Sequence, residues 1–195
     1  MSEGAKLSIR LFIVTAIAAL ALGITHAVTE EPIRLQNEQV SLEARKAVLP
    51  DAQEFVEVDL SEYKDEYPNV VEAYQGKSGD ETVGYVFRVV SKGYGGDVEL
   101  YVGIDVNENK IESVNIISHN ETPGLGAKAA GLDFLSQYSG KPVDGPLTAV
   151  RGRATQDAQV EAITGATITS KAVTEGVNSA VELYGRVLKN GGAER

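Results

Sequence analysis

An uncharged apolar segment of 18 residues, Leu11–Val28, limits the folds open to this chain more than any other feature of its sequence. A helix needs about 20 residues to cross a hydrocarbon core of roughly 30 Å, and the adjoining Leu7 and Ile9 bring the segment to that length. Arg10 lies within the extended segment, where a long basic side chain reaches the headgroups. The sequence therefore predicts one N-terminal transmembrane helix.

The charges on either side of this segment predict its orientation. Lys6 and Arg10 precede it, whereas the first charges after it are acidic. Basic flanks stay on the cytoplasmic side of a membrane. We therefore expect residues 1–29 to form a cytoplasmic stub and transmembrane anchor in the cell membrane. Residues 30–195 are expected to form an extracytoplasmic domain.

A cleaved signal peptide is the alternative to a retained anchor. Thr25-His26-Ala27 is a poor small-x-small cleavage site. The apolar run also exceeds the roughly 7–15 residues of a signal core. These two observations favour a single-pass anchor.

Composition excludes several kinds of function. The formal net charge of −10 is unfavourable for binding nucleic acid or an anionic lipid surface. The sequence has no cysteine and two histidines, so it lacks the ligands of an iron–sulfur cluster or a multi-histidine metal site. Any redox chemistry would therefore need an organic cofactor.

The part after the anchor has the pattern of one α+β domain. Segments rich in β-branched and aromatic residues predict strands, and a polar turn at 107–109 joins two of them as a hairpin. Residues 51–75 are expected to form short strands or turns. These patterns predict a mostly antiparallel sheet with strands at 54–58, 82–90, 98–106, 110–118 and 147–150.

Helices are expected in three places. Residues 30–49 predict a helix that opens near Pro32 and ends before Pro50. A second helix is expected around 127–138. The third, at about 170–188, has apolar residues at i, i+4, i+7 and i+8 and is expected to end at Gly191-Gly192.

Two loop motifs indicate a binding site. In Glu121-Thr122-Pro123-Gly124-Leu125-Gly126, the proline fixes one dihedral and the glycines permit close approach to a flat ligand. Thr164-Gly165-Ala166-Thr167 offers a hydroxyl with room around it beside a helix start, where backbone N–H groups can hold a phosphate. An ordinary loop entering a helix is the alternative for each motif.

In this order, about 40 residues apart, the motifs resemble those of the FMN-binding domain family, in which the last threonine of Ser/Thr-Gly-Ala-Thr is esterified to the phosphate of FMN. Nearly the whole chain is similar to the G subunits of the Rnf family of membrane electron-transport complexes. These are related to the C subunits of sodium-translocating NADH:quinone oxidoreductases. The resemblance implies a membrane-anchored electron carrier with covalent FMN in an ion-translocating complex that passes electrons between ferredoxin and NAD, coupled to sodium or proton transport. The implied partners are the other subunits and a flavin transferase.

The resemblance also implies residue roles. Thr167 would form the phosphoester, and the loop Glu121–Gly126 would lie against the isoalloxazine ring. The cofactor-binding residues that it implies are Thr164, Gly165, Ala166, Thr169, Glu121, Thr122, Pro123, Gly124, Leu125, Gly126 and Lys128.

Several of these side chains have a second interpretation. Lys128 would offset the charge of the phosphate or flavin, or would be a solvated surface lysine. Ser170 would hydrogen-bond the phosphate or cap the final helix, and capping is the expected role. His119 would contact the flavin or simply end a strand, and Tyr94 would cap a cleft or belong to the core.

Glu161 departs from the family pattern. Flavin transferases of this family recognise an aspartate three residues before the Ser/Thr of the attachment motif, and this position is Glu161 here. The charge is kept and displaced by one methylene. The resemblance therefore implies that the flavin transferase recognises Glu161. It does not say how efficiently a chain with glutamate at this position is flavinylated.

Other functions are weighed against this one. The chain could be a membrane-tethered assembly or binding module without a cofactor, or a flavin-bearing regulatory domain outside such complexes. Gly-x-Ser-x-Gly and Walker motifs are absent from the sequence, which disfavours a hydrolase. It also has no NAD-binding fingerprint, so a redox subunit is expected in place of a complete enzyme.

Replacing the two threonines of the attachment motif should separate their roles. Thr167→Ala removes the hydroxyl oxygen of the ester and should abolish covalent flavin, whereas Thr164→Ala should leave some. Flavin fluorescence in a denaturing gel measures both. Equal fluorescence from the two variants would contradict the assignment of Thr167.

Overall fold

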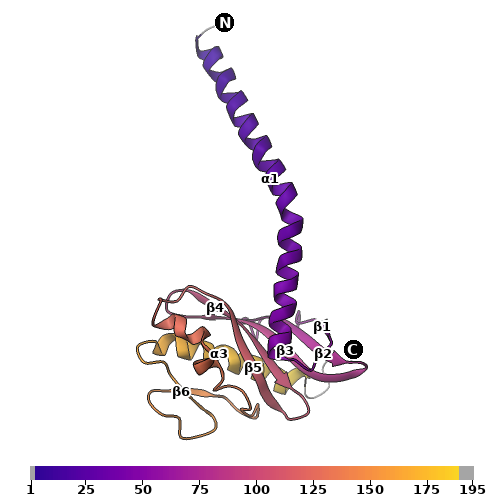
Figure 1. The fold of residues 1–195 in the computed structure, drawn as a ribbon, viewed down its shortest axis with the longest axis vertical. Helices are drawn as coiled ribbons and strands as arrows, with labels where there is room; N and C mark the ends of the chain where they lie inside the picture. Colours follow the sequence, from indigo (N-terminus) through magenta and orange to yellow (C-terminus); the bar gives the residue numbers. More distant parts are fainter. Residues whose placement is uncertain (1–2, 189–195) are drawn as a thin grey trace. The chain divides into compact units, whose positions relative to one another are not determined.

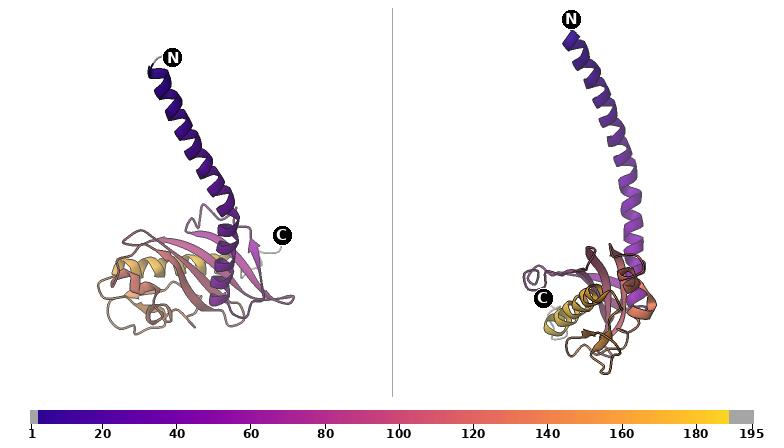
Figure 2. Two further views of the ribbon diagram at one scale, coloured as in Figure 1. Left: turned by 45° about the horizontal axis from the view of Figure 1, so that its top comes forward. Right: turned by 90° about the vertical axis from the view of Figure 1, so that its left-hand side faces the viewer.

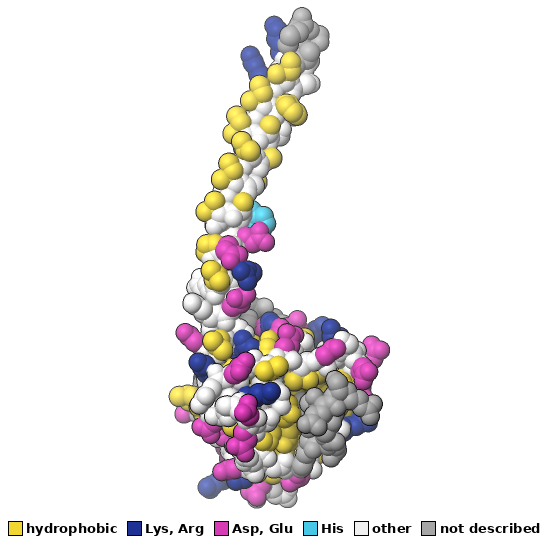
Figure 3. All heavy atoms as spheres, turned by 90° about the vertical axis from the view of Figure 1, so that its right-hand side faces the viewer, with side chains coloured by type: hydrophobic (Ala, Val, Ile, Leu, Met, Phe, Trp, Pro, Cys, Tyr) yellow, Lys and Arg dark blue, Asp and Glu magenta, His cyan; other side chains and the backbone are white. Residues whose placement is uncertain are grey.

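The computed structural model describes residues 3–188. The chain divides into two units, residues 1–42 and 43–195. Most of helix α1 (Glu3–Val48) lies in the first unit, and it is long and apolar enough to cross a membrane. Apolar side chains cover its middle, with basic side chains near its N-terminal end and charges of both signs farther along (Figure 3). These apolar side chains are exposed; Leu11, for example, is 66% exposed and Leu22 is 72% exposed.

Helix α1 is continuous through Pro32, so the expectation that a separate helix opens there is wrong. Proline removes one backbone donor from a helix and disfavours its interior. Here Arg34 bridges that region through ion pairs with Glu31 and Glu38, both at 2.7 Å. The predicted end before Pro50 is confirmed at Val48.

The second unit is built on a five-stranded sheet in which consecutive strands pair antiparallel (Figure 1). The strands expected at 54–58, 82–90, 98–106 and 110–118 are confirmed, the last two as a hairpin. Strand β2 was not expected as one continuous strand, because the polar residues Glu72, Gln75 and Lys77 are interspersed among its buried residues without a clear alternation. The strands are β1 (Glu54–Val58), β2 (Val70–Ser78), β3 (Glu81–Lys92), β4 (Asp97–Asp105) and β5 (Lys110–His119).

One face of the sheet packs against helix α3 (Thr167–Leu183), which runs along it in both views of Figure 2. Burial of this amphipathic helix against the sheet accounts for most of the core. The helix begins three residues earlier than the expected Ser170 and continues as a π-helical turn, η2 (Tyr184–Leu188). The expected end at Gly191-Gly192 lies outside the described residues. The largest core side chains on this face include Phe87, Leu100, Ile104, Ile111, Tyr138 and Leu183.

The connection between β5 and α3 is more broken than its sequence pattern indicates. The helix expected around 127–138 is a 3-10 turn, η1 (Gly126–Ala130), followed by a single α-helical turn, α2 (Leu132–Leu135). Gly131 separates them with an extended backbone, at φ −79° and ψ 146°. Next come β6 (Thr148–Val150), near the strand expected at 147–150, and β7 (Gln159–Glu161), which pair in parallel.

The opposite face of the sheet receives the end of helix α1. Val48 and Leu49 are 0% and 2% exposed there, and they pack with Val86 and Tyr101. The Arg45 guanidinium also lies 4.1 Å from the ring centroid of Tyr74, a cation–π contact.

Glycines on three adjacent strands make room for this helix end. Gly76 pairs with Gly84, and Gly103 lies on the next strand. A Cβ added at Gly76 would come within 2.5 Å of Leu49 Cδ2, and one at Gly103 would overlap the carbonyl group of Val48. We call Gly76, Gly84 and Gly103 the glycine socket. The socket lets the backbone of the α1 terminus lie directly on the sheet.

Gly103→Ala should destabilise the domain, because the new methyl group displaces the Val48 backbone from the sheet. Overpacking of this kind costs about 1–3 kcal/mol. The thermal midpoint of the full chain in detergent should fall by roughly 5 °C. Gly145→Ala is the control, since no atom lies within 4 Å of its added Cβ. Equal midpoints for the two variants would refute the socket.

Candidate functional site

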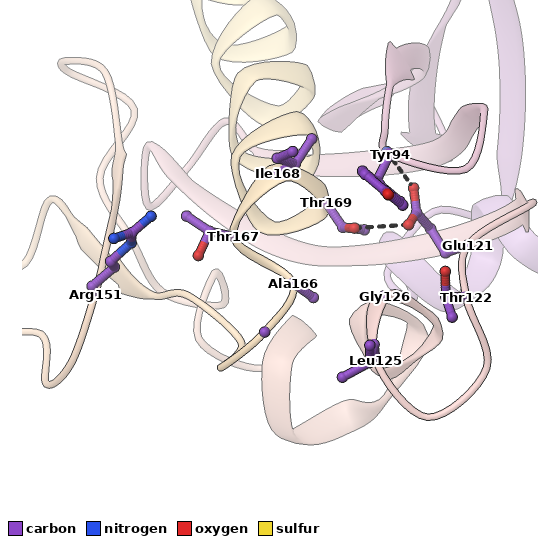
Figure 4. A pocket seen from close by; sticks show the side chains of 11 residues that line it. Tyr94, Glu121, Thr122, Leu125, Gly126, Arg151, Ala166, Thr167, Ile168 and Thr169 are labelled. Carbon is purple, nitrogen blue, oxygen red and sulfur yellow. Dashed lines mark hydrogen bonds between the residues drawn. The ribbon is translucent and has the colours of Figure 1, made fainter.

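A cavity of about 440 Å³ lies between the start of α3 and the loop after β5 (Figure 4). Its volume is in the range of small-molecule and cofactor sites. Both motifs singled out in the sequence contribute to it, together with residues from two further segments. The lining residues are Tyr94, Glu121, Thr122, Leu125, Gly126, Arg151, Gly165, Ala166, Thr167, Ile168 and Thr169.

Thr167 is the first residue of α3, and its side chain borders the cavity (Figure 4). The chain enters the helix through Gly165, whose φ of +83° lies in the left-handed region that glycine adopts without strain. The first amide groups of a helix have no intrahelical acceptor, and Ala166 at the N-cap has no side-chain oxygen to offer them. The site therefore combines a hydroxyl with a helix N-terminus that favours an anion.

Ser170 lies inside the helix and is not its N-cap, so the expected capping role is wrong. Its buried hydroxyl accepts a hydrogen bond from Ile163 N at 3.0 Å and donates one to Ala166 O at 3.0 Å. Because these two atoms lie on either side of the Thr164–Gly165 turn, Ser170 ties the attachment loop to the helix that follows it.

Two further buried residues, Thr174 and Tyr138, help to fix the start of α3. Thr174 donates from Oγ1 to Ser170 O at 2.8 Å and contacts the Tyr138 hydroxyl at 2.8 Å. Burial raises the pKa of Tyr138, so its phenol stays protonated. The first turns of α3 are therefore fixed by side chains that do not line the cavity.

Glu121 lines the cavity on the side away from Arg151 in Figure 4, and it is 6% exposed. Its Oε1 accepts hydrogen bonds from Tyr94 N at 2.7 Å and Gly95 N at 3.1 Å. Its Oε2 accepts one from the Thr169 hydroxyl at 2.8 Å (Figure 4). The Glu121 carboxylate and the Thr169 hydroxyl, which were both expected to bind the cofactor, thus bind each other.

Two lining residues were absent from the sites expected from sequence alone. Arg151 is the one basic residue among the described residues that line the cavity, and it lies on the same side as Thr167 in Figure 4. Ile168 is 55% exposed beside Thr167. Tyr94 had two interpretations, and the structure places it at the cavity with 72% of its surface exposed. The Arg151-Gly152-Arg153 cluster in a loop was the available sequence signal for Arg151.

Other expected residues lie outside the cavity wall. Thr164, Pro123, Gly124 and Lys128 do not line it. His119 Nδ1 accepts a hydrogen bond from Glu121 N at 3.3 Å. Within residues 3–188, His, Asp and Glu side chains form no group able to hold a metal ion.

Glu161 ends β7 and is exposed. Its Oε1 accepts a hydrogen bond from Ala154 N at 3.0 Å, and its backbone N and O bond to the Gln137 side chain. The carboxylate therefore holds the loop between β6 and β7, which carries Arg151.

Comparisons with known proteins identify the family of the chain. The FMN-binding domain family matches residues 93–182, a range that contains both motifs. The chain is 41% identical to the G subunit of the Na(+)-translocating ferredoxin:NAD(+) oxidoreductase complex of Acetobacterium woodii, with 94% of this chain and 93% of that one covered. It is 37% identical to the G subunit of the proton-translocating ferredoxin:NAD(+) oxidoreductase complex of Clostridium ljungdahlii, over 91% and 87% of the two chains.

Solved structures share the fold. The C subunit of the Na(+)-translocating NADH-quinone reductase of Parabacteroides distasonis matches with a TM-score of 0.52 and 22% identity, covering 79% of this chain and 94% of that one. NqrC of Shewanella oneidensis matches with a TM-score of 0.52 and 23% identity, over 58% and 57%.

Ser170→Ala should loosen the attachment loop, because Ile163 N loses its acceptor. An unsatisfied amide costs about 1–3 kcal/mol. Hydrogen exchange measured by mass spectrometry should become faster in peptides that cover residues 162–168. Ser179→Ala is the matched control, since Ser179 also donates to the carbonyl four residues earlier in α3 and lies away from the loop. Unchanged exchange in Ser170→Ala would contradict the supporting role.

Proposed function

Because this chain belongs to the family of G subunits of ion-translocating ferredoxin:NAD(+) oxidoreductase complexes and contains an FMN-binding domain, we propose that it carries FMN as a phosphoester on Thr167. Such a subunit is an electron carrier, and FMN supplies its redox chemistry. The chain itself binds and orients the cofactor. The observation that carries the proposal is the position of the Thr167 hydroxyl at the first residue of α3, on the wall of a cavity of cofactor size.

The charges around Thr167 suit a phosphodiester. A phosphodiester keeps one negative charge, which the N-terminus of a 17-residue helix stabilises. Arg151 borders the same side of the cavity and supplies a positive charge. We infer that Arg151 takes the role toward the phosphate that the sequence suggested for Lys128.

The remaining walls suit a flat, partly apolar ring. Tyr94, Leu125 and Ile168 line the cavity and are 72%, 46% and 55% exposed. Exposed apolar surface of this kind gains stability when a ligand covers it. The loop Glu121–Gly126 would lie against the ring, while Gly165 and Ala166 would leave space for the ring and its phosphate. Thr164, Pro123 and Gly124 do not line the cavity and would contribute by setting the backbone conformation of the two loops.

The long apolar part of α1 supports a place in the membrane. We propose that α1 anchors the chain as a single-pass protein with its N-terminus in the cytoplasm, because basic residues precede the apolar segment. Residues 30–195 would then lie outside the cytoplasm. The partners would be other subunits of the complex, which deliver and remove the electrons.

Maturation requires a flavin transferase in this proposal. Glu161 lies three residues before Thr164 and is exposed, which leaves it open to a second protein. Its carboxylate already holds Ala154 N, so recognition would involve the β6–β7 loop together with Glu161.

Intact-mass measurement tests the proposal directly. The full chain, co-expressed with a flavin transferase, should gain the mass of FMN minus water, and the adduct should map to the peptide that contains Thr167. The chain expressed without the transferase is the control and should keep its unmodified mass. An unmodified mass in the presence of an active transferase would refute the proposal and favour a cofactor-free assembly module.

A further inference from the structure

The Glu121 carboxylate joins three segments that are distant in the sequence. Its donors come from the turn between β3 and β4, at Tyr94 and Gly95, and from the first turn of α3, at Thr169. Glu121 itself begins the loop that lines the cavity. The relative positions of three of the cavity walls therefore depend on one side chain.

Glycines enclose this carboxylate closely. A Cβ added at Gly93 would overlap Oε1 of Glu121, and one added at Gly126 would overlap Oε2. These two glycines come from different segments and approach the carboxylate from two sides. Their small size therefore serves the close packing around Glu121.

The Glu121 carboxylate is held by hydrogen bonds and not by an ion pair within residues 3–188. All three of its partners donate hydrogen bonds, which is the pattern of an ionised carboxylate that acts only as an acceptor. Among residues 3–188, no lysine, arginine or histidine forms an ion pair with Glu121. Two backbone amides, one hydroxyl and the adjacent N-terminus of α3 stabilise the charge in place of a cation.

We propose that Glu121 is a positioning residue that fixes three walls of the cavity and lowers the reduction potential of the bound FMN through its negative charge. The inference rests on the proposed function, since it concerns the same cavity. Its carboxylate would not be a flavin ligand, because both oxygens are engaged by the protein.

The effect on potential follows from electrostatics. Reduction adds electron density to a flavin, and a fixed negative charge beside the ring opposes that addition. Burial of Glu121 strengthens the effect, because water screens a buried charge poorly. The Thr169 hydroxyl offsets part of the charge by donating to it.

Glu121→Gln removes the charge and nearly preserves the shape. Its amide oxygen can accept from Tyr94 N and Gly95 N, and its NH₂ group can donate to the Thr169 hydroxyl. The midpoint potential of FMN on the full chain, titrated spectroelectrochemically at one pH, should rise relative to the wild type. Glu175→Gln is the control for the loss of one charge, since Glu175 is exposed on α3 and does not line the cavity. Its potential should equal that of the wild type.

Thr169→Val supplies an independent test with the opposite sign. It keeps the volume and the Glu121 charge but removes one donor, so the potential should fall. A rise in both variants would indicate general loosening of the cavity and would overturn the inference. An unchanged potential in FMN-loaded Glu121→Gln would overturn it as well, while leaving the proposed function intact.

Failure of the proposed function has a different signature. A wild-type chain without covalent FMN would refute both proposals together. If Glu121→Gln does not fold, the Thr169→Val variant decides alone, and the absence of a downward shift would refute the role of the charge.

Discussion

The hydrogen bonds of Glu121 determine how the candidate site is assembled. The turn between β3 and β4, the loop after β5 and the first turn of α3 are separate in the sequence, and one buried carboxylate connects them. A buried charge without donors is costly, so the β3–β4 turn and the first turn of α3 must each present an N–H or O–H group to it. The arrangement of the cavity walls and the burial of the carboxylate are therefore mutually dependent. This dependence explains why small residues, Gly93 and Gly126, lie beside it.

The sheet supports the site by having both faces covered. One face packs on α3, whose N-terminus reaches the cavity, and the other receives the end of α1 in the glycine socket. Close packing of this kind leaves little freedom for either helix end to shift. The start of α3 is fixed further by the Ser170, Thr174 and Tyr138 hydroxyl groups. These contacts hold Thr167 at the cavity wall.

In the proposed site, the cofactor supplies the redox chemistry and the protein supplies its environment. The sequence has no cysteine, so this chain cannot bind an iron–sulfur cluster, and an organic cofactor suits its place in an electron-transport complex. A phosphoester to Thr167 would hold such a cofactor without dependence on binding affinity. The protein is then left to set the environment of the cofactor, through Arg151, the N-terminus of α3 and the Glu121 charge, all of which lie at the cavity.

Local sequence patterns were sufficient to predict the long apolar N-terminal helix, four of the five strands of the antiparallel sheet, the final helix and the two motifs that meet at the cavity. These features depend on local periodicity or on short motifs, which neighbouring residues carry. Three features are apparent only in the folded chain: the hydrogen bond between Glu121 and Thr169, the contribution of Arg151 and Ile168 to the cavity, and the position of Ser170 inside α3. The sequence patterns also failed to predict three features of the fold: strand β2, the break at Gly131 and the continuity of α1 through Pro32. Glu121 and Thr169 are 48 residues apart. No local pattern encodes such a contact, because it exists only after the sheet and α3 have packed together.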